Sequence, residues 1–255
     1  MIESIERLRI TGKTKEALEG VIREGQVDPL QIPNIPDEIL ANKMRAWRIW
    51  VVTLLSESQK TLDGEKSSQI LYEAEKVIGR LYHHEVVKEK ALEIKTDPSG
   101  NEYQMAAEML RDEGKYYLYL ARLTSNPLHL DQVISAFDAA IGVSEKGTST
   151  NALATMEREI AKRENGEKMD FFNFKRSYFQ VLTLSDGAGG DDRAAAASLM
   201  YARESFLARQ FSESRVGFEN FLNYSSKYRS KKQAGLQVLK EVTRPIADRI
   251  RRITL

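Results

Sequence analysis

Residues 115–145, KYYLYLARLTSNPLHLDQVISAFDAAIGVSE, place large and small apolar side chains at helical spacing on both sides of a central Asn-Pro pair. Residues three and four apart share one face of a helix, and a proline disfavours helical conformation in the residue before it. The stretch therefore predicts two helices joined by a turn, with small residues that let the helices approach closely. The residues in this register are Tyr117, Leu120 and Ala121 in the first helix and Val133, Phe137 and Ala140 in the second.

The three- and four-residue spacing recurs along the whole chain, and no long stretch alternates apolar and polar residues. It predicts an all-α fold of about ten helices. The polar turn at residues 96–101 is the clearest break, and it divides the chain into an N-terminal helical subdomain, 1–96, and a C-terminal one, 101–255. The main helices are expected over residues 37–58, 67–83 with an extension toward 94, 102–123, 130–144, 151–164, 168–184, 193–208, 212–224 and 231–253, the last kinked at Pro245.

The composition excludes several classes of chemistry. The 255 residues contain no cysteine, which rules out disulfides, thiolate nucleophiles and cysteine-bound zinc or iron–sulfur clusters. The N-terminus is too acidic for a signal peptide, and the longest apolar run, residues 47–55, is far shorter than the roughly 20 residues that span a bilayer. We therefore expect a cytoplasmic protein.

The charge is uneven although the net charge is only +1. Residues 226–255 hold nine Lys or Arg against two acidic residues, so this end carries +7 and the rest of the chain −6. Three interpretations stay open: a capping helix with a basic outer face, a patch for nucleic acid or an anionic protein, and contact with an acidic membrane surface. The patch residues are Lys227, Arg229, Lys231, Lys232, Arg244, Arg251 and Arg252.

The pattern of residues 117–140 resembles the tetratricopeptide (TPR) repeat, a pair of helices of about 34 residues. Weaker matches lie at Tyr201, Ala202, Ser214 and Phe218, where Phe221 departs from the pattern, and at Gly12, Ala17 and Pro29. The resemblance covers about half of the chain and implies a right-handed TPR-like α-solenoid of three or four helix pairs with irregular terminal helices. The solenoid either occupies the C-terminal subdomain or is continuous across both subdomains. An irregular helical bundle is the alternative.

The resemblance also implies a concave partner groove lined by the first helix of each pair. Because a guanidinium holds a carboxylate through two parallel hydrogen bonds, Arg122 and Arg203 are candidates for gripping an acidic group of a partner. Alternatively, each pairs with a glutamate of this chain. Leu118 and Arg122 differ from the Lys and Asn of chaperone-binding members, so we expect no recognition of chaperone tails. The full set implied by position is Leu118, Arg122, Ser125, Leu199, Arg203 and Phe206.

Other motifs point to structure more than to chemistry. His83 and His84 are adjacent, so on a helix they project about 100° apart and do not face one metal ion. The glycine-rich residues 187–190 lack the Lys-Ser/Thr of a phosphate loop and are flanked by aspartates. Trp47 and Trp50 share one apolar helix face and are expected in the core. We expect no metal and no cofactor.

These observations favour a non-enzymatic scaffold or adaptor that binds a protein or peptide in its groove. One alternative is a nucleic-acid-associated protein that acts through the basic C-terminal helix. The other is a helical regulator or enzyme that responds to a small molecule. The identity of the partner, the pathway and the oligomeric state lie beyond what the sequence determines.

Overall fold

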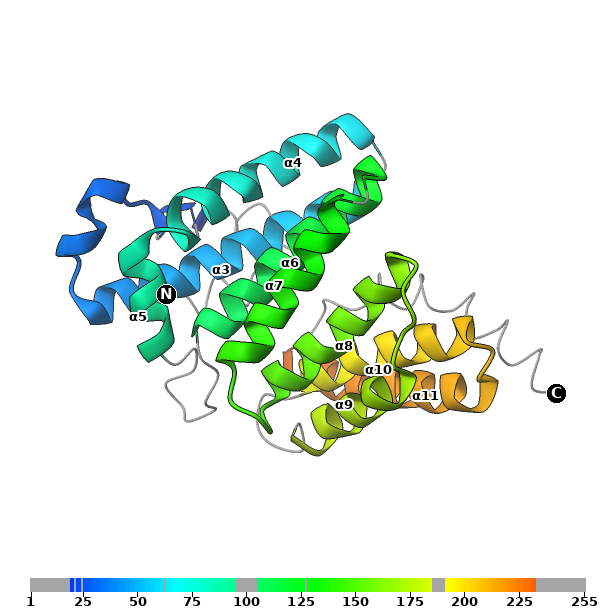
Figure 1. Ribbon diagram of the computed structural model, residues 1–255. Helices are drawn as coiled ribbons and strands as arrows, with labels where there is room; N and C mark the ends of the chain where they lie inside the picture. Colours follow the sequence, from blue (N-terminus) through cyan, green and yellow to red (C-terminus); the bar gives the residue numbers. More distant parts are fainter. Residues whose placement is uncertain are drawn as a thin grey trace.

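The computed structural model describes residues 19–20, 22–23, 25–61, 63–94, 105–126, 128–184 and 191–232, and of 191–192 and 227–232 it describes the backbone only. Every element within these ranges is a helix, which confirms the all-α class (Figure 1). The part of the last expected helix beyond residue 232, the kink at Pro245 and the glycine-rich residues 187–190 lie outside the described residues.

The described helices follow the expected order along the chain. They are the 3₁₀ helix η1 Pro29–Asn34, α3 Asp37–Lys60, α4 Gly64–Val77, the π-helical turn η2 Ile78–Tyr82, α5 Glu85–Glu93, α6 Met105–Thr124, α7 Leu128–Val143, α8 Ser149–Glu164, α9 Phe171–Leu184, α10 Asp191–Leu207 and α11 Phe211–Lys232.

Helix starts are decided by capping side chains. The Asp63 carboxylate accepts hydrogen bonds from the backbone N–H groups of Glu65 and Lys66, so α4 begins at Gly64, three residues earlier than its apolar pattern predicts. Thr148 caps α8 in the same way through Asn151. The predicted extension of the 67–83 helix toward residue 94 is interrupted, because η2 widens the last turn of α4 and α5 starts anew at Glu85.

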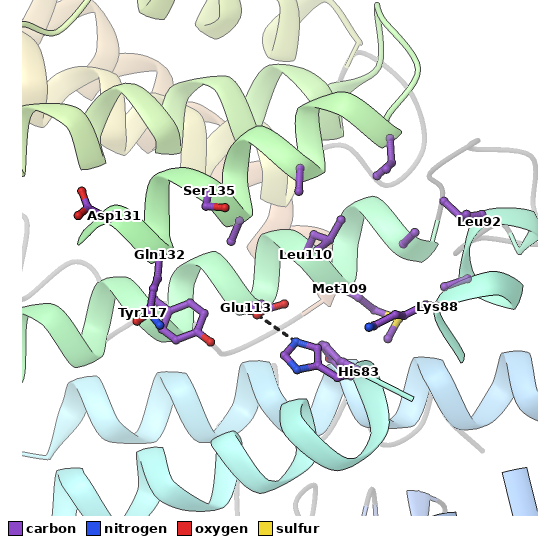
Figure 2. Close-up of a pocket in the computed structure, with 16 residues that line it drawn as sticks. His83, Lys88, Leu92, Met109, Leu110, Glu113, Tyr117, Asp131, Gln132 and Ser135 are labelled. Atoms are coloured by element: carbon purple, nitrogen blue, oxygen red, sulfur yellow. Dashed lines mark hydrogen bonds and ion pairs between the residues drawn. The ribbon is translucent and has the colours of Figure 1, made fainter. Parts of the chain in front are cut away.

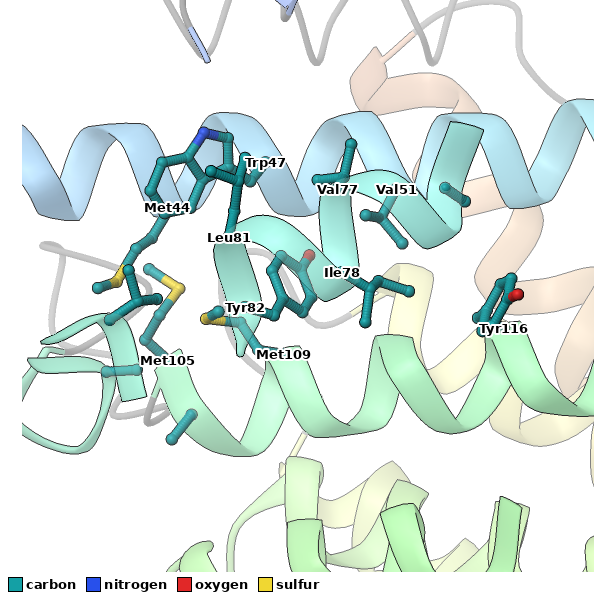
Figure 3. Close-up of a cluster of buried hydrophobic side chains, with 14 of the residues drawn as sticks. Met44, Trp47, Val51, Val77, Ile78, Leu81, Tyr82, Met105, Met109 and Tyr116 are labelled. Carbon is teal, nitrogen blue, oxygen red and sulfur yellow. The ribbon is translucent and has the colours of Figure 1, made fainter. Parts of the chain in front are cut away.

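The first core lies between α3, α4, η2 and α6 (Figure 3). Trp47 is buried there, as expected, and its indole N–H donates to the Gly25 carbonyl over 2.8 Å. Trp50 lies partly buried at the edge of the same cluster. Met105, Met109 and Tyr116 enter this core from α6. Helix α6 therefore packs on helices that precede the expected subdomain boundary at residues 96–101.

Later helices pack first against their neighbours in sequence. Helix α6 contacts α7, α7 contacts α8, α8 contacts α9, and α10 contacts α11, while α8 also touches both α6 and α10. Two of these contacts are so close that they require glycine. A Cβ at Gly114 would lie 2.7 Å from the Phe137 ring, and one at Gly217 would lie 2.8 Å from the Ala202 backbone nitrogen. The small-residue register therefore brings α7 onto α6 and α11 onto α10.

Helix α9 buries only one of its two aromatic faces. Phe174 and Tyr178 are fully buried, and the Tyr178 ring stacks on Tyr201 of α10 with centroids 4.1 Å apart. Phe172, on the other face, is 78% exposed. The helix thus contributes one aromatic face to the core with α8 and α10 and presents Phe172 to solvent.

Candidate functional site

Arginine–carboxylate pairs join α3, α6, α8 and α10 along one side of the fold. Arg48 of α3 donates to Asp112 over 2.9 Å and to Glu108 over 2.7 Å, and both carboxylates belong to α6. Arg111 of α6 holds Glu157 of α8 through two hydrogen bonds of 2.6 and 3.0 Å. Burial alone disfavours the charged form of each of these side chains. Ion pairing offsets this desolvation cost for both members of a pair.

A second group of charges lies farther along α6, α8 and α10. Arg122 binds both oxygens of Glu164 over 3.0 and 2.7 Å, and Arg163 binds both oxygens of Glu204 over 2.6 and 3.2 Å. Arg203 approaches the same two carboxylates at 3.9 and 3.8 Å. We call these five residues the Arg122–Arg203 cluster. It contains three guanidinium groups and two carboxylates.

The electrostatics of the cluster favour the ionised form of Glu164. Partial burial raises the pKa of Glu164, but the hydrogen bond and charge of Arg122, together with the charges of Arg203 and Arg163, outweigh it and hold the pKa below its ordinary value. Arg203 differs from the other two arginines: its side chain is 53% exposed, and both of its carboxylate contacts exceed hydrogen-bonding distance. Its donors remain available to a further acceptor.

The six residues predicted for the partner groove do not form one open surface. Leu118 is only 7% exposed and packs with Val133, Phe137 and Ala161, so its side chain belongs to the core. The structure does bring Arg122 and Arg203 together, because both arginines contact the carboxylate of Glu164. From the sequence, Arg122 could grip an acidic group of a partner or pair with a glutamate of this chain. In the structure it pairs with Glu164.

The other three predicted groove residues have separate environments. Ser125 is exposed just beyond α6, where its φ of 53° ends the helix. Leu199 is half-buried and packs toward α11, and Phe206 contacts the edge of Phe211 with ring centroids 5.8 Å apart. The side chains of the predicted anionic-partner patch all lie outside the described residues.

Sequence reasoning missed a pocket between α5 and α7. It has a volume of about 750 Å³ and is lined by η2, α5, α6 and α7 (Figure 2). Near its middle His83 Nε2 lies 3.1 Å from Glu113 of α6. This hydrogen bond is the main reason that the pKa of His83 is raised above its ordinary value. We call this cavity the α5–α7 pocket.

The signal for this pocket in the sequence is faint. Small residues recur on the facing sides of α6 and α7, at Ala106, Ala136 and Ala139, but the same alanines suit simple helix packing. His83 and Glu113 are thirty residues apart, and nothing local pairs them.

Within the described residues there is no group of three or more His, Asp or Glu side chains placed to hold a metal ion. Likewise, none of the described helices is both long and apolar enough to cross a membrane. Comparison of the chain with protein-family models, with curated proteins and with solved structures finds no match.

Proposed function

We propose that the chain is a non-enzymatic helical scaffold that binds an acidic segment of a protein or peptide across α6, α8 and α10. The observation that carries this proposal is the Arg122–Arg203 cluster, in which three guanidinium groups share two carboxylates and Arg203 makes no hydrogen bond to either. A partner carboxylate would supply the missing acceptor.

The packing of the later helices supports a TPR-like solenoid as the framework. The pairs α6–α7, α8–α9 and α10–α11 follow one another, and the first helices of successive pairs touch through α8. Positions that the repeat pattern requires to be small or aromatic are buried, among them Ala121, Phe137 and Ala140. In the last pair, the Ser214 hydroxyl donates to the Ala202 carbonyl over 2.8 Å. In such an arrangement α6, α8 and α10 line a common face.

The partner's chemistry follows from the charges on that face. Glu164 is only 16% exposed and is held by Arg122, whereas the guanidinium of Arg203 reaches solvent. An aspartate, glutamate or terminal carboxylate that approaches Arg203 gains a charge-assisted hydrogen bond without breaking the Arg122–Glu164 pair. The cluster therefore accepts one further anion at little structural cost.

A phage-displayed library of random peptides tests this proposal. We expect selection on the wild-type protein to enrich Asp and Glu, and selection on Arg203→Glu to lose that enrichment. Arg176→Glu is the matched control, because Arg176 is an exposed arginine on α9 and is not a member of the cluster. For a selected peptide, the Kd measured by fluorescence anisotropy should rise at least about tenfold in Arg203→Glu, which corresponds to about 1.4 kcal/mol.

Two outcomes would contradict the proposal. One is selection without acidic enrichment, and the other is equal binding by the wild type and Arg203→Glu. Retention of nucleic acid that survives Arg203→Glu, but is lost after charge reversal at Lys231, Lys232, Arg251 and Arg252, would favour the nucleic-acid alternative instead.

A further inference from the structure

The α5–α7 pocket has the size and lining of a site for a small molecule. Its volume of about 750 Å³ lies within the range of roughly 300–1,000 Å³ that is usual for small-molecule sites. The α6 residues that line it recur at three- and four-residue steps from Ala106 to Tyr117, so one face of α6 runs along the whole cavity. Helices α5 and α7 add apolar side chains to the remaining wall, namely Ala91, Leu92, Ala136, Ala139 and Val143.

One buried carboxylate lies near the middle of this apolar lining. The Glu113 side chain is only 12% exposed and points toward His83 (Figure 2). It accepts a hydrogen bond from the His83 ring over 3.1 Å. A carboxylate offers about four acceptor positions on its two oxygens, so this protein donor leaves it capacity for a ligand donor.

The charges around the pocket favour a cationic ligand group. Glu113 and Asp131 are both lining carboxylates. In Figure 2 Asp131 lies on the same side as Tyr117, and Glu113 lies between Tyr117 and Lys88. Lys88 lies toward the other side, with Leu92, and its ammonium group pairs with Glu85 over 3.2 Å. When His83 is neutral, Glu113 has no cationic partner in the pocket. The face of the Tyr117 ring can also attract an ammonium group through a cation–π interaction.

We propose that the α5–α7 pocket binds a small apolar molecule that carries one ammonium group. The ammonium donates to Glu113 beside Tyr117, and the apolar body lies along Met109, Ala139 and Leu92. This site shares no residue with the Arg122–Arg203 cluster, so it stands independently of the acidic-peptide face proposed above.

Three matched probes test the ligand class: 4-phenylbutylamine, 4-phenylbutanol and 4-phenylbutanoate share one apolar body and differ in one polar group. Calorimetry at about pH 8.5 keeps the amine protonated, since an alkylamine has an ordinary pKa near 10.4. This pH lies about two units above the ordinary histidine pKa of 6.5, which leaves room for the raised pKa of His83. We expect the amine to bind at least about tenfold more tightly than the alcohol, and the carboxylate to bind most weakly.

Two variants separate the charge from the cavity. Glu113→Gln keeps the shape and an acceptor oxygen, so it should lower amine affinity to the level of the alcohol. Ala139→Phe places a ring into the pocket from an exposed position on α7 and should abolish binding of all three probes. The matched controls are Glu89→Gln, an exposed carboxylate on α5, and Ala196→Phe, an exposed alanine on α10, and both should bind as the wild type does.

The possible results distinguish a wrong ligand class from a wrong site. Equal affinity for amine and alcohol, or an amine preference that persists in Glu113→Gln, would overturn the proposed ligand class. Absence of binding by all three probes to the folded wild-type protein would overturn the site itself. Acidic-peptide binding is measured separately, so failure here leaves the scaffold proposal to its own test.

Discussion

Arg111 on α6 and Glu157 on α8 form a two-pronged ion pair inside the protein, with Nε and Nη2 donating to the two carboxylate oxygens over 2.6 and 3.0 Å. Both side chains are about nine-tenths buried. The pair ties α6 to α8, two helices that are separated in sequence by α7. Arg48 ties α3 to α6 in a comparable way, so buried charge contributes to the join between the N-terminal and later helices.

Removal of the Glu157 charge should strongly destabilise the fold. In Glu157→Gln the buried Arg111 guanidinium loses its main counter-charge, and losing one member of a buried pair typically costs about 3–5 kcal/mol. Urea unfolding followed by circular dichroism measures the difference. Replacement of both residues, as Arg111→Met with Glu157→Leu, should cost less than Glu157→Gln alone. A cost below about 1 kcal/mol for Glu157→Gln would mean that water reaches the pair.

Two glycines on the packed pair α6 and α7 should respond oppositely to alanine. Gly114→Ala forces a methyl group against the Phe137 ring, 2.7 Å away, and overpacking of this kind costs about 1–3 kcal/mol. Gly142 has no neighbouring atom within 4 Å of the new Cβ, so Gly142→Ala should be neutral or stabilise by up to about 1 kcal/mol. Thermal unfolding of the two variants compares them directly. Equal effects would contradict the tight α6–α7 contact.

The His83–Glu113 pair should make stability depend weakly on pH. Because the folded protein raises the pKa of His83, the pair stabilises the fold fully below the ordinary histidine pKa of about 6.5, and this contribution is lost as the pH rises through the higher folded value. His83 is 44% exposed, so we expect less than about 1 kcal/mol. Urea unfolding of wild type and His83→Gln across this pH range measures the gap. A gap that grows with rising pH would contradict the assignment.

Glu164 should compete with an acidic partner for Arg203, which approaches it at 3.9 Å, while Arg122 stays paired with Glu164. Glu164→Gln removes one of two carboxylates and leaves three guanidinium groups, so an acidic peptide selected on the wild type should bind several-fold more tightly. Fluorescence anisotropy measures this gain, with Glu167→Gln, a nearby exposed carboxylate, as the control. Weaker binding by Glu164→Gln would mean that Glu164 positions the arginines more than it competes for them.

Much of the helical framework was predictable because its causes are local. Asn126 and the proline after it mark a helix end, and the three- and four-residue spacing identifies the apolar faces. The break between α3 and α4 was also predicted, although the Asp63 cap starts α4 three residues earlier than its apolar pattern indicates. Trp47 was predicted to be buried for the same reason. The break before α5 was not, since a π-helical turn depends on how α4 meets α3 and α6 more than on any residue type within it.

The sequence alone determined that this chain is helical and which face of most helices is apolar, because spacing along one helix depends on residues only a few positions apart. Only the tertiary structure decided that Leu118 is buried, that Arg122 and Arg203 meet at Glu164, and that His83 pairs with Glu113 in a pocket. These outcomes depend on the rotation and axial offset of one helix against another. The rotation and the offset are set by the packing of many side chains together, so they cannot be predicted from residues that are close in sequence.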